Sequence, residues 1–186
     1  MLKYFVIKLT LLCLVLAFSA SAESAEVDRA SRIKAAFALN VSRFVTWPEG
    51  TFTRVEKITL CLFEDNFLGA AKNSLIGQKI DGLPLVVNDQ INLETVTDCQ
   101  IIFVAGKKLE KLAVDYPQIT QRPVLVIVDN TDYKEASIEH SIAMVSLIRK
   151  GSSIGFDVNL MQVEAVNLKM SSKLLKLTRN IYTSTK

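Results

Sequence analysis

Two cysteines, Cys61 and Cys99, are the residues of this chain best placed to do chemistry with each other. Cys61 lies inside the apolar, β-branched segment 57–63, and Cys99 directly precedes a second such segment, 100–104. Both segments are typical of strands. In an oxidising compartment an even pair of cysteines most simply forms a disulfide, which would close about 39 residues and contribute roughly 4 kcal/mol. Two buried free thiols are the alternative.

The other reactive side chains do not form a recognisable catalytic or metal-binding pattern. His140 is the only histidine, and the chain has no Cys-x-x-Cys, serine-hydrolase, zinc-protease, phosphate-loop or dinucleotide motif. Ser171, Ser172 and Lys173 lie too close along a helix to face one another, and helix capping explains these serines better. Turns or caps explain Glu64 and Asp65. We therefore expect no enzyme, no catalytic residue, no metal and no cofactor.

The first 22 residues have the three parts of a secretory signal. Lys3 and Lys8 precede the apolar run 9–18, and Ala20-Ser-Ala22 supplies the small residues that a signal peptidase requires. The run is short for a bilayer span, which makes a retained membrane anchor the weaker alternative. We expect residues 1–22 to be a cleaved signal peptide and residues 23–186 to form a single periplasmic domain without direct membrane insertion.

Export also removes most of the net positive charge, which is +3 for the whole chain. The whole chain has 22 Lys and Arg against 19 Asp and Glu, but two lysines and no acid lie within residues 1–22. The mature charge is then 20 minus 19, or +1. This balance does not favour an acidic partner, and an exported protein does not meet nucleic acid or NAD as everyday partners.

The pattern of elements predicts an α/β fold. Helical spacing runs from Val27 to Trp47 and ends at Pro48. Further expected segments are strands at 57–63, 82–87, 100–104 and 123–128, short helices at 67–76 and 107–114, a hairpin of 142–148 and 153–158, and helical sequence over 160–181. The continuous apolar run 123–128 indicates a strand covered on both faces. The sequence predicts a single-domain layered sandwich with a mixed, mostly parallel sheet and helices on both faces.

The C-terminal segment carries clear capping signals. Asn159 is placed to cap a helix starting at Leu160, and Asn167 suits a left-handed residue after that helix. Ser171 or Ser172 can cap a second helix with inward-facing residues at 174, 175, 178 and 181. The basic residues of this segment, Lys169, Lys173, Lys176 and Arg179, are expected to face solvent.

Phe44 and Trp47 add aromatic area at the end of the first helix, where Asn40 interrupts its apolar stripe. One interpretation places both in the core, since large aromatic residues are highly buried on average. The other makes them partner-binding residues, in an exposed apolar patch that a second copy or another protein covers.

The sequence resembles the YfiR-like family of bacterial periplasmic proteins. Segment 34–48 looks like the family's opening helix, and five further motifs follow in the family's order: Leu60–Phe63, Cys99–Phe103, Pro123–Asp129, Gly155–Asn159 and Leu168–Leu175. The resemblance implies an α/β sandwich that is often dimeric and has no known catalysis. It also implies a regulator that represses an inner-membrane diguanylate cyclase by binding its periplasmic sensor domain, under redox control through disulfides.

The chain departs from the family pattern at three places. Polar residues 137–141 replace the usual glycines before the hairpin, Asn167 stands where a glycine is usual, and a second cysteine pair is missing. Any redox response would therefore depend on Cys61 and Cys99. A small-ligand sensor or carrier is the alternative function, because α/β sheets offer a crevice at the carboxyl ends of their strands.

The signal pattern leads to a first prediction. Mass spectrometry of the exported protein should find an N-terminus at Glu23, because cleavage follows the small-residue site. An intact Met1 in the membrane fraction would contradict it.

Overall fold

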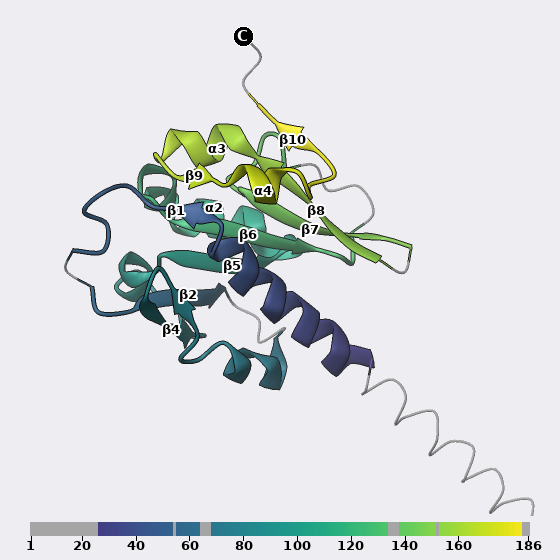
Figure 1. Cartoon of the computed structure of the whole chain (residues 1–186), viewed down its shortest axis with the longest axis horizontal. Helices are drawn as coiled ribbons and strands as arrows, with labels where there is room; N and C mark the ends of the chain where they lie inside the picture. Colours follow the sequence, from purple (N-terminus) through teal and green to yellow (C-terminus); the bar gives the residue numbers. More distant parts are fainter. Residues whose placement is uncertain (1–25, 54, 64–67, 134–137, 152, 184–186) are drawn as a thin grey trace, which may run out of the picture.

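The computed structural model describes residues 26–53, 55–63, 68–133, 138–151 and 153–183. Over these residues an eight-stranded sheet has the order β10-β8-β7-β6-β5-β2-β4-β3, and β1 and β9 form a separate pair (Figure 1). The strands are β1 Val45–Thr46, β2 Ile58–Phe63, β3 Lys79–Ile80, β4 Leu83–Asn88, β5 Ile101–Ala105, β6 Leu125–Asn130, β7 Val145–Lys150, β8 Ser153–Asn159, β9 Lys169–Met170 and β10 Ile181–Tyr182.

The middle of the sheet is parallel. The pairs β2–β4, β2–β5, β5–β6 and β6–β7 all run parallel, as does the short edge pair β8–β10. Only β3–β4 and the β7–β8 hairpin are antiparallel within this sheet. The prediction of a mixed, mostly parallel sheet is thus confirmed, and so is the hairpin, in whose turn Gly151 has a φ of +60°.

Alternate residues of the central strands enter two separate cores. In β2, Leu60 and Leu62 join one hydrophobic cluster, whereas Cys61 and Phe63 join the other. Strand β6 divides in the same way and is buried along its whole length. Successive side chains of a strand point to opposite faces of the sheet. A strand in which every residue is apolar therefore needs a covering layer on each face. The continuous apolar run in the sequence predicted this double burial.

Helices supply both covers, which confirms the layered sandwich. The first core receives the N-terminal helix (residues 26–42), the 3-10 helix η1 Gly69–Ser74, α3 Leu160–Ala165 and α4 Ser172–Leu175. The second receives the 3-10 helices η2 Thr95–Asp98 and η4 Pro117–Gln121, with α2 Leu109–Asp115 between them in sequence; η3 Gly106–Lys108 leads into α2. Within the described residues, no helix is long and apolar enough to cross a membrane.

The N-terminal helix ends earlier than its sequence pattern indicates. Helical structure stops at residue 42, and Val45 and Thr46 form β1, which pairs antiparallel with β9. Both residues are β-branched, and the residue before Pro48 is biased away from helical conformation. Tertiary pairing with a segment more than 120 residues away therefore overrides the local helical spacing.

The C-terminal segment is also less helical than expected. Instead of only the two expected helices within 160–181, it contains α3, β9, α4 and β10. The caps are confirmed: Asn159 accepts from the Gln162 N–H, Ser171 accepts from the Lys173 N–H, and Asn167 has a φ of +58°. The expectation that residue 181 faces inward was wrong, because Ile181 lies in an edge strand and is 43% exposed.

A buried ion pair fixes the N-terminal helix against the end of β6. The Lys34 ammonium lies 2.6 Å from Asp129 Oδ2, and both side chains are nearly buried. The other oxygen of Asp129 accepts from the amide and hydroxyl of Thr131. Next to it, Gly106 approaches Asn130 so closely that a Cβ would lie 2.0 Å from the amide oxygen. The ion pair between Lys34 and Asp129 therefore restricts how the N-terminal helix can lie on the sheet.

We expect Asp129→Asn to lower the free energy of unfolding by about 3–5 kcal/mol, because it leaves the Lys34 charge buried without its partner. The matched control is Asp28→Asn, which removes an exposed ion pair with Arg32 on the same helix. That control should cost less than about 0.5 kcal/mol. Urea unfolding measures both, and equal losses would contradict the structural role of the buried pair.

Candidate functional site

The predicted disulfide between Cys61 and Cys99 is present. Their Cα atoms are 5.8 Å apart, which lies within the usual range for a bridge. Cys61 is central in β2 and points into the second core, and Cys99 ends η2 just before β5. The bond therefore ties the short η2 segment down onto the sheet strand next to it. The alternative of two free thiols is excluded for this structure.

The disulfide is shielded from solvent. Cys61 and Cys99 are 0% and 1% exposed, and they pack among the apolar residues of the second core. A reductant must therefore wait for the covering segment to open before it can reach either sulfur. This burial makes the bond first of all a structural link, and any redox response has to include opening of that segment.

The two candidate partner-binding residues do not lie together on an exposed patch. Trp47 is 6% exposed and belongs to the first core, where its ring centroid lies 5.4 Å from that of Phe52. Its indole N–H is buried without a hydrogen-bond partner among the described residues. Phe44 is half-buried and packs against the same core. The core interpretation is therefore correct for Trp47, and an exposed patch at this helix end can include only Phe44.

Apolar surface near Phe44 comes instead from the C-terminal segment. The carbonyl of Phe44 accepts from the Ser171 amide at 2.9 Å, just after β9 pairs with β1. The half-buried Met170 and Leu175 follow in the same segment, and Leu177 is 70% exposed. We name Phe44, Met170, Leu175 and Leu177 the C-terminal surface. Sequence patterns did not reveal this surface, because β9, which lies between the two expected helices, forms by pairing with the distant β1.

A single carboxylate holds the end of this segment to the sheet. Asp157 in β8 is 2% exposed, and its two oxygens accept from Arg179 Nε at 3.1 Å and Nη2 at 2.8 Å. The amide of Asn180 donates to the same carboxylate at 3.2 Å. The hydrogen bonds that Arg179 donates to the Asp157 carboxylate raise the pKa of Arg179 above its ordinary value. Arg179 faces solvent as expected, with 48% of its side chain exposed, and it also docks the C-terminal segment on Asp157.

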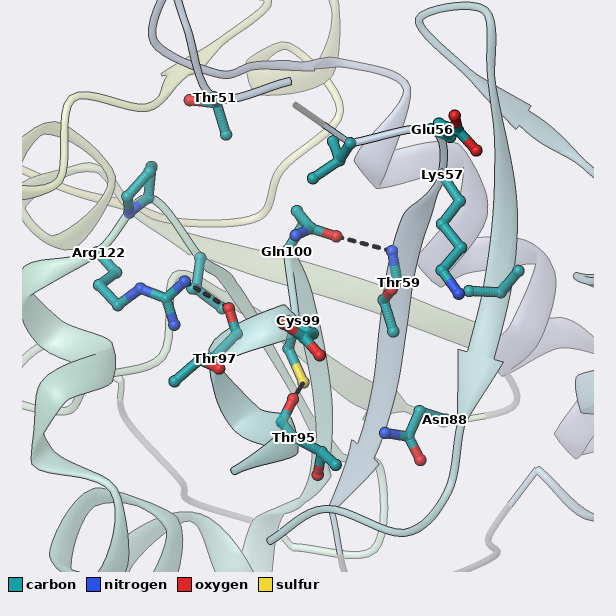
Figure 2. A pocket seen from close by; sticks show the side chains of 15 residues that line it. Thr51, Glu56, Lys57, Thr59, Asn88, Thr95, Thr97, Cys99, Gln100 and Arg122 are labelled. Carbon is teal, nitrogen blue, oxygen red and sulfur yellow. Dashed lines mark hydrogen bonds between the residues drawn. The ribbon is translucent and has the colours of Figure 1, made fainter. Parts of the chain in front are cut away.

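A pocket of about 690 Å³ lies beside the disulfide, at the amino ends of β2, β5 and β6 (Figure 2). Its walls include Thr59 and Cys99, together with Gln100 before β5 and Arg122 before β6. The side-chain oxygen Oε1 of Gln100 accepts from the Thr59 backbone amide at 2.8 Å and so bridges two strands. The crevice expected for a small ligand was at the opposite, carboxyl ends of the strands.

Among the residues that the structure describes, the remaining candidates from the sequence form no site. His140 is exposed, and Ser171 caps α4. Glu64 and Asp65 lie outside the described residues. Over the part of the chain that the structure describes, no three His, Cys, Asp or Glu residues gather as metal ligands would.

The chain matches a known protein family. A family model described as YfiR/HmsC-like matches residues 31–179, from the N-terminal helix to Arg179 at the Asp157 contact. The match thus covers most of the chain and includes the disulfide, the pocket and the C-terminal surface. No curated protein matches the chain significantly.

We expect the double substitution Cys61→Ser and Cys99→Ser to lower the free energy of unfolding by roughly 2–5 kcal/mol, because the bond restricts the unfolded chain. Full reduction of the wild type should produce a similar loss of thermal stability. The doubly substituted protein serves as the control, since reductant should leave its melting temperature unchanged. A wild type that melts at the same temperature before and after reduction would contradict the structural role of the bond.

Proposed function

Because the chain belongs to the YfiR/HmsC-like family, we propose that it is a periplasmic regulator of cyclic di-GMP signalling. In this proposal the mature protein binds the periplasmic sensor domain of an inner-membrane diguanylate cyclase and represses the enzyme. The family match over residues 31–179 is the observation that carries the proposal. The signal-like sequence of residues 1–22 supports the location.

We propose the C-terminal surface as the region that contacts the sensor domain. Exposed apolar side chains at a partner interface gain free energy when the partner covers them, and Leu177 is the most exposed residue of this surface. The contact between Asp157 and Arg179 holds the segment in place, which reduces the ordering cost of binding. In this arrangement Phe44 contributes at the edge of the interface, and the buried Trp47 supports it from within the core.

Repression then follows from differential affinity. A regulator that binds the inactive state of the sensor domain more tightly than the active state shifts the enzyme toward inactivity, by no more than the difference between the two affinities. Coupling energies of about 1–3 kcal/mol are typical of such systems and correspond to roughly 5- to 150-fold changes. The cyclase would regain activity whenever the folded regulator becomes scarce.

The disulfide provides a route to such a change. Its loss lowers the stability of the fold, so reducing conditions decrease the population of the folded, binding-competent protein. In this proposal oxidation maintains repression and reduction relieves it.

The test compares two equally exposed apolar residues in the intact cell. Deleting the gene should raise cyclic di-GMP, and wild-type protein supplied in trans should restore the low level. Leu177→Asp should fail to restore it, because a charge at the interface opposes binding. Val114→Asp is the matched control: Val114 is 71% exposed but lies in α2, which covers the opposite face of the sheet.

The control should lower cyclic di-GMP as well as the wild type does, and both variants should melt within a few degrees of it. If deletion leaves cyclic di-GMP unchanged in a strain that contains such a cyclase, the regulator function is wrong. If deletion raises it but Leu177→Asp restores repression fully, the function stands and the C-terminal surface is not the interface.

A further inference from the structure

The pocket beside the disulfide contains several hydrogen-bond donors that the protein itself does not use (Figure 2). Most of its hydroxyl groups are already engaged: Thr51 donates to the Pro48 carbonyl at 2.7 Å, and Thr97 donates to the Glu94 carbonyl at 2.8 Å. These side chains need no ligand to complete their hydrogen bonds. The donors that have no acceptor among the described residues therefore determine which ligands the pocket can bind.

Arg122 is the most informative of these groups. Its Nη2 donates to the Thr97 carbonyl, but its Nη1 is buried and has no hydrogen-bond partner in the described part of the chain. Buried donors that remain unpaired are rare and destabilising, and charged ones more so. A negatively charged oxygen that enters beside Arg122 would supply the acceptor that the protein does not.

Two further donors point to the same chemistry. The side-chain oxygen of Gln100 accepts from the Thr59 backbone amide, which leaves the side-chain NH₂ group of Gln100 available. Figure 2 shows this side-chain nitrogen on the side of Gln100 nearer Arg122. Lys57 adds an exposed ammonium on the opposite wall. Arg122, Gln100 and Lys57 thus bring donors from three segments to the lining of one pocket.

The charge and size of the pocket narrow the ligand class. Glu56 and Asp98 also line it, so its four charged side chains sum to zero. The two acids repel a singly charged carboxylate less than they would repel a phosphate dianion, and Arg122 can pair with the single charge. Apolar contacts from Val86, Val124 and the disulfide suit an uncharged body, and about 690 Å³ is ample for a small molecule.

We propose that this pocket binds a small organic monocarboxylate, with its carboxylate on Arg122 and Gln100 and its apolar body against the disulfide wall. This site is separate from the C-terminal surface, and its test does not depend on regulation of a cyclase. Because Cys99 is among the residues that line the pocket, a bound ligand would lie next to the buried disulfide.

Benzoate is a suitable test compound, compared with neutral benzamide and with phenyl phosphate. Ligand-observed NMR titration of the oxidised mature protein should give a dissociation constant for benzoate at least about 10-fold lower than for benzamide, as expected for a charge-assisted hydrogen bond. Phenyl phosphate at neutral pH should bind more weakly than benzoate. Arg122→Gln should abolish the preference for benzoate over benzamide.

Arg149→Gln is the matched control, since Arg149 is exposed at the far end of the β7–β8 hairpin and should leave the preference intact. Amide chemical shifts of the wild type give a second readout that needs no variant: benzoate should shift Thr59, Gln100 and Val124. Equal affinities for benzoate and benzamide, or shifts confined to residues outside the pocket, would overturn the proposal. Tighter binding of phenyl phosphate would replace the monocarboxylate with a phosphate ligand.

Discussion

The structure depends on the burial of its central parallel strands on both faces. Strands β2, β5 and β6 contain apolar side chains on each side, and leaving either side open would expose a continuous hydrophobic surface. The helices meet this requirement: the N-terminal helix, η1 and the C-terminal helices cover one face, and α2 with η2 and η4 covers the other. The hairpin and β3 extend the sheet beyond this doubly covered centre.

The helices on the two faces of the sheet are attached by different interactions, and the two candidate sites lie on different faces. On the first face, the buried pair of Lys34 and Asp129 and the clamp of Asp157 on Arg179 fix helices whose outer surface stays available. On the second face the covering helices are short, and a covalent link from Cys61 to Cys99 compensates for their small contact area. The pocket opens beside that link. A protein-binding surface and a ligand pocket can therefore coexist on opposite faces without sharing residues.

Local sequence patterns predicted the features that depend on local physics. Continuous apolar runs identified the doubly buried strands, and the caps at Asn159 and Ser171 followed from side-chain chemistry. The disulfide followed from cysteine count and compartment. The errors arose where distant segments meet: β1 replaced the last helical turn because β9 pairs with it. The pairing of the exposed Arg179 with Asp157, 22 residues earlier, likewise has no local signal in the sequence. The pocket joins five separate segments, so no single stretch of sequence indicates it.

We propose that this protein represses a diguanylate cyclase by direct contact. The most direct measurement is the rate of cyclic di-GMP synthesis by the full-length cyclase in lipid nanodiscs, while oxidised mature protein is added to its periplasmic side. We expect a saturable fall in the rate of cyclic di-GMP synthesis. Reductant should reverse this fall, because the disulfide opens and the fold loses stability. A rate that stays unchanged at saturating protein, with no complex detected between the two, would contradict it.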